Sequence, residues 1–131
     1  MRIRIPFAIT FSLLILLAAY TGFSSISPPI NDKVLHFFTF FLLALTFYWI
    51  LETTRRRAVN FTFVSITLIA SILSEILQPL VNSTRLFDPL DILANALGSL
   101  TALGLNGWYH KRMLSRKREK KNRYAALATD D

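Results

Sequence analysis

Cysteine is absent from this chain of 131 residues, which excludes a disulfide framework and a thiolate metal site. Acidic residues are also scarce, with eight Asp and Glu against 15 Lys and Arg, and the formal net charge is +7. A basic balance can indicate nucleic-acid binding, but the sequence has no nucleic-acid-binding motif. Because 53% of the residues are hydrophobic, a membrane surface is the anionic partner that the composition favours.

Charge is nearly missing from four long stretches, which is typical of membrane spans. A bilayer core of roughly 30 Å needs about 20 apolar residues in a helix. The four stretches that approach this length are residues 5–23, 34–51, 58–80 and 90–108. The connections between them are short, which favours antiparallel neighbours. The sequence therefore predicts an all-α fold, a four-helix transmembrane bundle with antiparallel neighbours, within a membrane domain of residues 1–110.

Lys and Arg are distributed unevenly around the predicted spans. The amino end, the second connection and the tail lie on one side of a four-span protein, and together they hold 13 of the 15 basic residues. The positive-inside rule places that side in the cytoplasm. We therefore expect a multi-pass protein of the plasma membrane or an endomembrane with both termini cytoplasmic. Residues 111–131 are predicted to form a flexible basic tail that attracts anionic lipid of the cytoplasmic leaflet.

The amino end allows a second interpretation. Arg2 and Arg4 followed by an apolar run resemble a secretory signal peptide. The run is long for the hydrophobic region of such a signal, and the A-x-A-like cleavage site is poor. We therefore expect the first span to be retained, although cleavage would leave the other three spans in the same orientation.

Polar residues gather near the outer ends of three predicted spans. Ionisable side chains inside a span are costly and usually face a partner or a water-filled cavity. The opposite halves of the spans show no comparable cluster, so we predict one polar site near the outer face. Its candidate residues are His36, Glu75, Gln78, Arg85, Asp91 and Asn95, with Asp32, Lys33 and Asp88 as secondary candidates.

Structural roles are the alternative for several of these residues. Asp88, followed by Pro89, is typical of a helix N-cap, and Asp32 can cap the second span in the same way. The two cations of the outer side can simply extend toward lipid headgroups. For His36 and Glu75, the alternative to a functional site is a set of interhelical hydrogen bonds that only stabilises the bundle.

Small residues continue the polar stripe along the fourth predicted span. Asp88, Asp91, Asn95, Gly98 and Ala102 follow one another at steps of three or four. Small residues let neighbouring helix backbones approach closely. We therefore expect this stripe to face the bundle interior.

Three segments of the chain resemble the VanZ-like family of small integral membrane proteins. Residues 32–37 match the family pattern D-K-x-x-H-F, residues 75–78 match E-x-x-Q, and residues 85–98 match R-x-x-D-x-x-D-x-x-x-N-x-x-G. The likeness extends from about residue 28 to residue 104, so the basic tail lies outside it. The family's name-giving member is associated with low-level teicoplanin resistance, and the resemblance implies a small polytopic membrane protein without implying a reaction.

Three functions fit this pattern. We prefer a binding protein whose outward polar pocket takes a lipid headgroup or an envelope-related anionic ligand, with Lys33 and Arg85 suited to phosphate. An intramembrane enzyme acting on a lipid phosphate is an alternative, in which His36, Glu75 and Asp91 bind a metal or act as acid and base. No H-E-x-x-H, G-x-S-x-G or P-loop motif supports it. A small proton-coupled transporter is the third. Membrane lipids are the expected partners, and no metal ion or cofactor is assigned.

Overall fold

The computed structural model describes residues 2–23, 32–82 and 87–129. Its helices are α1 (Ile5–Phe23), α2 (Asp32–Tyr48), α3 (Arg55–Thr62), the π-helix η1 (Phe63–Ala70), α4 (Ser71–Val81) and α5 (Pro89–Thr129). Two short strands, β1 (Arg2–Ile3) and β2 (Leu51–Glu52), pair antiparallel. The predicted all-α fold is thus confirmed, with this small ribbon added.

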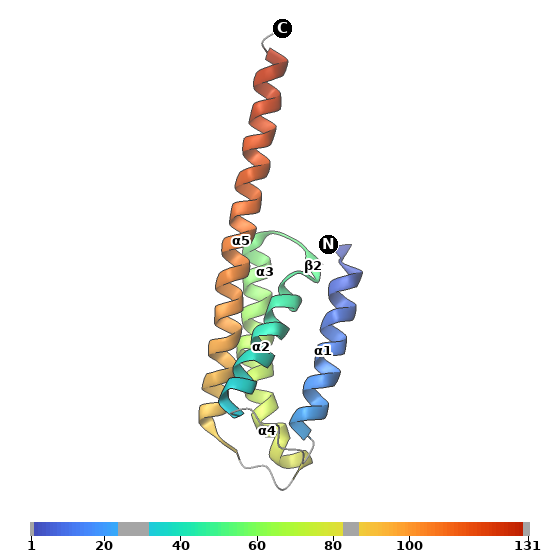
Figure 1. Ribbon diagram of the computed structural model, residues 1–131, viewed down its shortest axis with the longest axis vertical. Coiled ribbons are helices and arrows are strands. Elements are labelled where there is room, and N and C mark those ends of the chain that lie inside the picture. Colours follow the sequence, from blue (N-terminus) through green and yellow to red (C-terminus); the bar gives the residue numbers. More distant parts are fainter. Residues whose placement is uncertain (1, 24–31, 83–86, 130–131) are drawn as a thin grey trace.

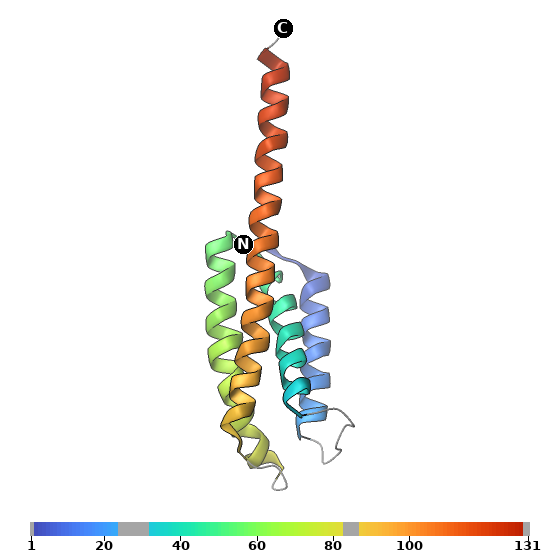
Figure 2. The same cartoon turned by 60° about the vertical axis from the view of Figure 1, so that its left-hand side comes forward.

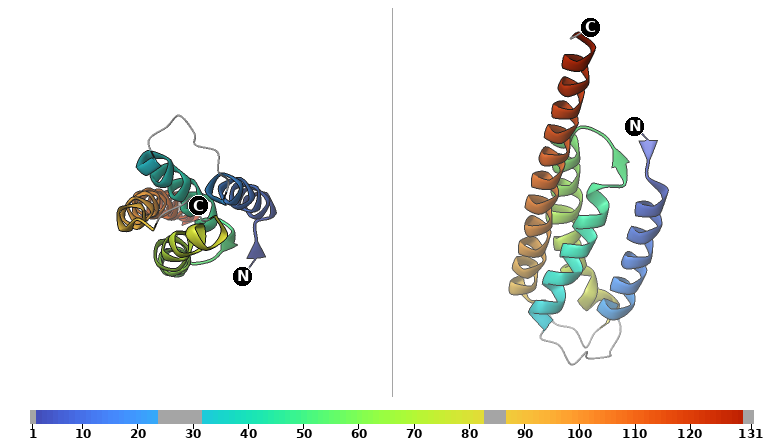
Figure 3. Two further views of the ribbon diagram at one scale, coloured as in Figure 1. Left: turned by 90° about the horizontal axis from the view of Figure 1, so that it is seen from below. Right: turned by 45° about the horizontal axis from the view of Figure 1, so that its top comes forward.

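The helices stand roughly side by side, and α2 lies between α1 and α5 (Figure 3). The segments α3, η1 and α4 form one helical run, Arg55–Val81, beside α5. One end of the bundle holds β1, β2 and the start of α3, and we call it the ribbon end (Figure 1). The other end, which we call the far end, holds the first turns of α2 and α5 and the last turn of α4. Polar residues of three helices can therefore meet at the far end.

The surface of the bundle is largely apolar, and its interior is partly polar. Leu13 and Leu16 are 62% and 66% exposed, whereas Glu75 is only 1% exposed. A soluble protein shows the opposite distribution, while helices in lipid turn costly polar groups inward. Two helical stretches, Ile5–Gly22 and Arg55–Val81, are long and apolar enough to cross a membrane. Together these features indicate a membrane protein.

The first predicted span coincides with α1, but the second ends earlier than predicted. The helix stops at Tyr48, and the chain turns so that β2 pairs with β1. The guanidinium of Arg4 donates to the carbonyl oxygens of Trp49 and Leu51. These carbonyls follow the helix end, where backbone acceptors lack helical partners. Arg4 therefore explains a turn that hydrophobic periodicity did not predict.

The basic tail also differs from the prediction, because α5 continues to Thr129 where we expected a flexible segment. No glycine or proline follows Gly107, and the tail is rich in Lys, Arg, Ala and Leu, which are strong helix formers. The tail part of α5 projects beyond the ribbon end in a direction continuous with the bundle (Figures 1 and 2).

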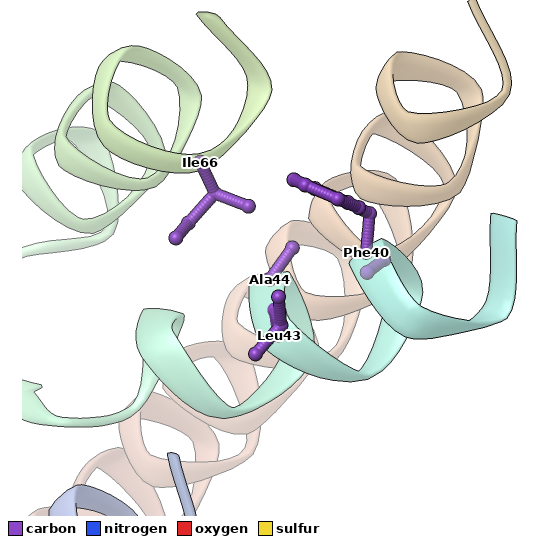
Figure 4. Packing of buried hydrophobic residues seen from close by; sticks show 5 residues of the cluster. Phe40, Leu43, Ala44 and Ile66 are labelled. Carbon is purple, nitrogen blue, oxygen red and sulfur yellow. The ribbon is translucent and has the colours of Figure 1, made fainter. Parts of the chain in front are cut away.

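A small apolar core fixes the middle of the bundle. Phe40, Leu43 and Ala44 of α2 pack with Ile66 of η1 and Ala102 of α5, and each is almost fully buried (Figure 4). The core therefore holds α2, η1 and α5 in one arrangement, and this arrangement sets the geometry of the polar groups at the far end.

The backbones of α2 and α5 approach each other closely at Gly98. A Cβ atom built at Gly98 would overlap the carbonyl oxygen of Phe37 in α2. The backbones of α2 and α5 are thus in direct contact, as the predicted small-residue stripe suggested. By contrast, a Cβ at Gly104 of the same helix would meet no heavy atom within 4 Å.

We expect Gly98→Ala to destabilise the fold by about 1–3 kcal/mol, because the added methyl group forces the two backbones apart. Gly104→Ala is the matched control. It gains helix propensity without a clash, so its stability should equal or exceed that of the parent. Thermal unfolding of the detergent-purified proteins, followed by circular dichroism, measures both. Equal melting temperatures for the two variants would contradict the inferred contact.

Candidate functional site

His36 and Asn95 form the centre of the far end, each in a separate helix. The Asn95 amide nitrogen donates to the Ser71 carbonyl oxygen and to the Ser74 hydroxyl, both at 3.3 Å. Its amide oxygen therefore faces the imidazole and accepts a hydrogen bond from His36 Nδ1 at 2.8 Å. Asn95 thus joins α2, α4 and α5 through one side chain.

Three carboxylates surround the same imidazole. Oδ2 of Asp91 and Oδ2 of Asp32 lie 3.6 and 3.7 Å from His36 Nε2. Oε1 of Glu75 lies 3.6 Å from His36 Nδ1, and it is buried without a hydrogen bond. The side chains of His36, Asp91 and Glu75 are buried, whereas that of Asp32 is 48% exposed. The far end therefore concentrates negative charge around one ring.

Lys33 occupies the rim of this cluster. Its ammonium group donates to Asp88 Oδ2 at 2.6 Å and also to Asp91 Oδ1. The hydrogen bond to Asp88 and, as the second cause, that to Asp91 raise the pKa of Lys33 far above its usual range. The lysine therefore stays charged at neutral pH. The bond from Lys33 also lowers the pKa of Asp88. Asp88 in addition accepts from the Leu90 amide at 3.0 Å, so the predicted helix cap is present.

A cavity of about 310 Å³ opens beside this cluster, between α1, α2 and α4. Asp32, His36 and Gln78 line it toward the far end. The remainder of its wall is mainly apolar and includes Ile15 of α1 and Leu43 of α2. Gln78 is buried against α1, where a Cβ at Gly22 would come within 2.9 Å of its amide nitrogen. The cavity is therefore amphipathic, with its polar groups at one end.

The structure brings most of the candidate residues together. Those that meet around the His36 ring or at its rim are Asp32, Lys33, His36, Glu75, Asp88, Asp91 and Asn95. Gln78 lies about one turn beyond Glu75 on α4, toward α1. Arg85 lies outside the described residues.

Several polar residues of the interior did not figure in the sequence prediction. Ser71 and Ser74 bind Asn95, and the Ser99 hydroxyl donates to the Thr67 hydroxyl at 2.9 Å. A signal was present, because Thr67, Ser71, Ser74 and Gln78 follow at steps of four, three and four, on the face that carries Glu75. Serine and threonine were overlooked because they also bond to their own helix backbone.

The prediction that only one end is polar is wrong. At the ribbon end, the Tyr48 hydroxyl lies 2.9 Å from His110 Nδ1, and Trp49 donates to Asn106 at 3.0 Å. Asn106 in turn donates to the Leu45 carbonyl oxygen at 3.3 Å. Burial of the ring is the main cause that lowers the pKa of His110, and the positive charges of nearby arginines are the second. The ring is therefore neutral at pH 7. Asn106 and His110 extend the interior stripe of α5 by two steps of four, a periodicity that we did not follow past Ala102.

This chain is similar to known proteins over most of its length. A family model described as VanZ/LLP1 matches residues 5–109. A relative from Schizosaccharomyces pombe, "Uncharacterized protein C11E3.10", is 43% identical over 122 residues, which cover 92% of this chain and 75% of the relative. No solved structure matches. The family match includes all the candidate residues and ends before the basic tail.

We expect Asn95→Ala to lower stability by about 1–3 kcal/mol, because it leaves the buried His36 Nδ1 donor without its acceptor. Thr101→Ala is the matched control on the same helix. The Thr101 hydroxyl is exposed and bonds only to the Leu97 carbonyl of its own helix, so its loss should have little effect. Thermal unfolding in detergent measures both variants. Asn95→Ala as stable as this control would contradict the inferred role of Asn95 in joining the helices.

Proposed function

This chain belongs to the VanZ/LLP1 family, and we propose that it is a four-span membrane protein whose outer polar site binds the headgroup of a lipid. The observation that carries this proposal is the amphipathic cavity between α1, α2 and α4. Small-molecule sites are typically concave, mostly apolar and supplied with a few polar groups, with volumes from about 300 Å³ upward. A cavity of about 310 Å³ is at the small end of that range. It suits part of one acyl chain better than a whole lipid.

The polar end of the cavity supplies the groups that recognise the headgroup. His36 and Gln78 line it directly, and Lys33 lies at the rim with 37% of its side chain exposed. Arg85 is a further phosphate donor in the proposal, since guanidinium groups suit bidentate phosphate contacts. A relative in a yeast favours a general membrane lipid over an anionic ligand restricted to bacterial envelopes.

The four-span topology rests on the helical runs together with the basic residues. The helix α2, with 17 residues, is at the short end of the range for spans, and α5 carries polar residues such as Asp91, Asn95 and Asn106. These polar side chains are buried against other helices, so they do not oppose insertion of the assembled bundle. With four spans, the arginines at the start of α3 and the α5 tail share one side, which the positive-inside rule makes cytoplasmic.

The projecting tail of α5 is a second lipid contact in this proposal. Eight Lys and Arg residues follow Tyr109, and they are Lys111, Arg112, Arg116, Lys117, Arg118, Lys120, Lys121 and Arg123. Basic segments next to a span are attracted to anionic lipid of the cytoplasmic leaflet by about 1 kcal/mol per residue near the surface. The tail therefore draws the protein toward anionic lipid without entering the outer site.

Topology is testable with reporters placed at three points. A reporter fused after Asp131 and one inserted at Arg56 should both lie in the cytoplasm, and one at Asn82 should lie on the opposite side. Cysteine accessibility offers an independent measurement, since the native chain has no cysteine to interfere. If the tail and Asn82 reporters lie on the same side, the four-span topology is wrong.

Filling the cavity should abolish lipid binding without unfolding the bundle. Ala18 lines the cavity from α1, so we expect Ala18→Phe to weaken phospholipid retention at least tenfold, measured by native mass spectrometry after incubation with phosphatidylserine. Leu17→Phe is the matched control, because Leu17 is 60% exposed on the outer face of the same helix. Equal retention by both variants, or no retention by the parent protein, would refute the proposed lipid site.

A further inference from the structure

Three potential ligand atoms lie close together at the far end. Oδ2 of Asp32 and Oδ2 of Asp91 lie 3.7 and 3.6 Å from His36 Nε2, and the ligand atoms of the three residues all lie within 4.8 Å of one another. Separations of 3.6–3.7 Å are too long for hydrogen bonds. Two ligands of a tetrahedral ion with bonds of about 2.1 Å lie about 3.4 Å apart. The separations of Nε2 from the two carboxylate oxygens are therefore close to those between two ligands of one ion.

The state of the His36 ring fits the same interpretation. Because the Asn95 amide oxygen accepts from Nδ1, a neutral ring carries its proton on Nδ1 and presents the lone pair of Nε2. The side chain of His36 is only 9% exposed, and Nε2 makes no hydrogen bond within the described part of the chain. A lone pair that faces two carboxylate oxygens is repelled by them, and a metal ion held between the three atoms would replace that repulsion by attraction. Metal-binding histidines commonly have this arrangement, with the other ring nitrogen fixed by a polar partner.

Charge balance points in the same direction. Lys33 binds Asp88 and Oδ1 of Asp91, but the oxygen of Asp91 that faces His36 is the other one, Oδ2. Glu75 adds a further carboxylate, whose Oε1 is buried without a hydrogen bond. Among the described residues of the cluster, four carboxyl groups thus lie near one lysine, so the site is rich in oxygen ligands for a cation.

We propose that Asp32, His36 and Asp91 hold a divalent transition-metal ion at the polar end of the cavity. One imidazole nitrogen with two carboxylate oxygens suits Zn²⁺ or Mn²⁺. Three protein ligands leave a coordination position open, and both Asp32 and His36 line the cavity. The ion would there attract a phosphate oxygen that the carboxylates alone repel. This site goes beyond lipid binding and does not require it.

Metal binding by the full-length, detergent-purified chain tests the proposal directly. After chelator treatment, the protein is titrated with Zn²⁺ and with Mn²⁺ by isothermal calorimetry, and the metal content after dialysis is measured. We expect one ion per chain. Asp32→Asn and His36→Ala should each weaken binding roughly tenfold or more, since even outer-shell changes have effects of that size. The Asp32 side chain is 48% exposed, so Asp32→Asn is expected to fold even if His36→Ala does not.

Two controls separate this site from adventitious binding. His110→Gln removes the other histidine, at the ribbon end, and Glu52→Gln removes an exposed carboxylate of β2. Both should bind metal as the parent does, and Co²⁺ should give an absorption spectrum that Asp32→Asn abolishes. No binding at one ion per chain, or binding that survives both Asp32→Asn and His36→Ala, would overturn the proposal. Because no lipid enters the measurement, either result is independent of the lipid-binding test.

Discussion

The direct backbone contact between α2 and α5 at Gly98 is the constraint on which the polar site depends. A side chain at position 98 would overlap the carbonyl oxygen of Phe37, and Phe37 is the residue next to His36. Asn95 lies three residues before Gly98 and hence on the same face of α5. The contact that brings the backbones together therefore also brings the imidazole within 2.8 Å of the Asn95 amide. A larger residue at position 98 would separate these groups without touching either of them.

Interactions other than hydrophobic burial hold the helices together, because lipid is as apolar as the bundle surface. Side-chain hydrogen bonds connect α5 to η1 and α4 through Ser99 and Asn95, and the small core around Ala44 adds close packing. The helix α1 has fewer such contacts, and none of the residues in its apolar stretch is fully buried. Its loose packing explains why the cavity lies along α1.

Much of the fold followed from the sequence, because length and hydropathy determine where helices can form. The bounds of α1, the all-α class and the grouping of polar residues on α2, α4 and α5 were all accessible in this way. The ribbon of β1 and β2 could not be predicted in this way, because each strand has only two residues. It also depends on Arg4, whose hydrogen-bond partners are 45 or more positions away in the sequence. The cluster around Asn106 was missed for a different reason. Asn106 and His110 continue the interior stripe of α5, and our prediction did not follow that periodicity past Ala102.

The two polar ends of the bundle differ in how completely their polar groups are hydrogen-bonded. At the ribbon end the polar side chains are paired, as Tyr48 is with His110 and Trp49 with Asn106, and the Thr62 hydroxyl is the exception among the described residues. At the far end, Glu75 Oε1 and His36 Nε2 make no hydrogen bond to any residue that the structure describes, although both side chains are buried. Polar groups that only stabilise a bundle are expected to be satisfied, since an unsatisfied one costs more than it contributes. This difference between the two ends is why we place the proposed binding site at the far end.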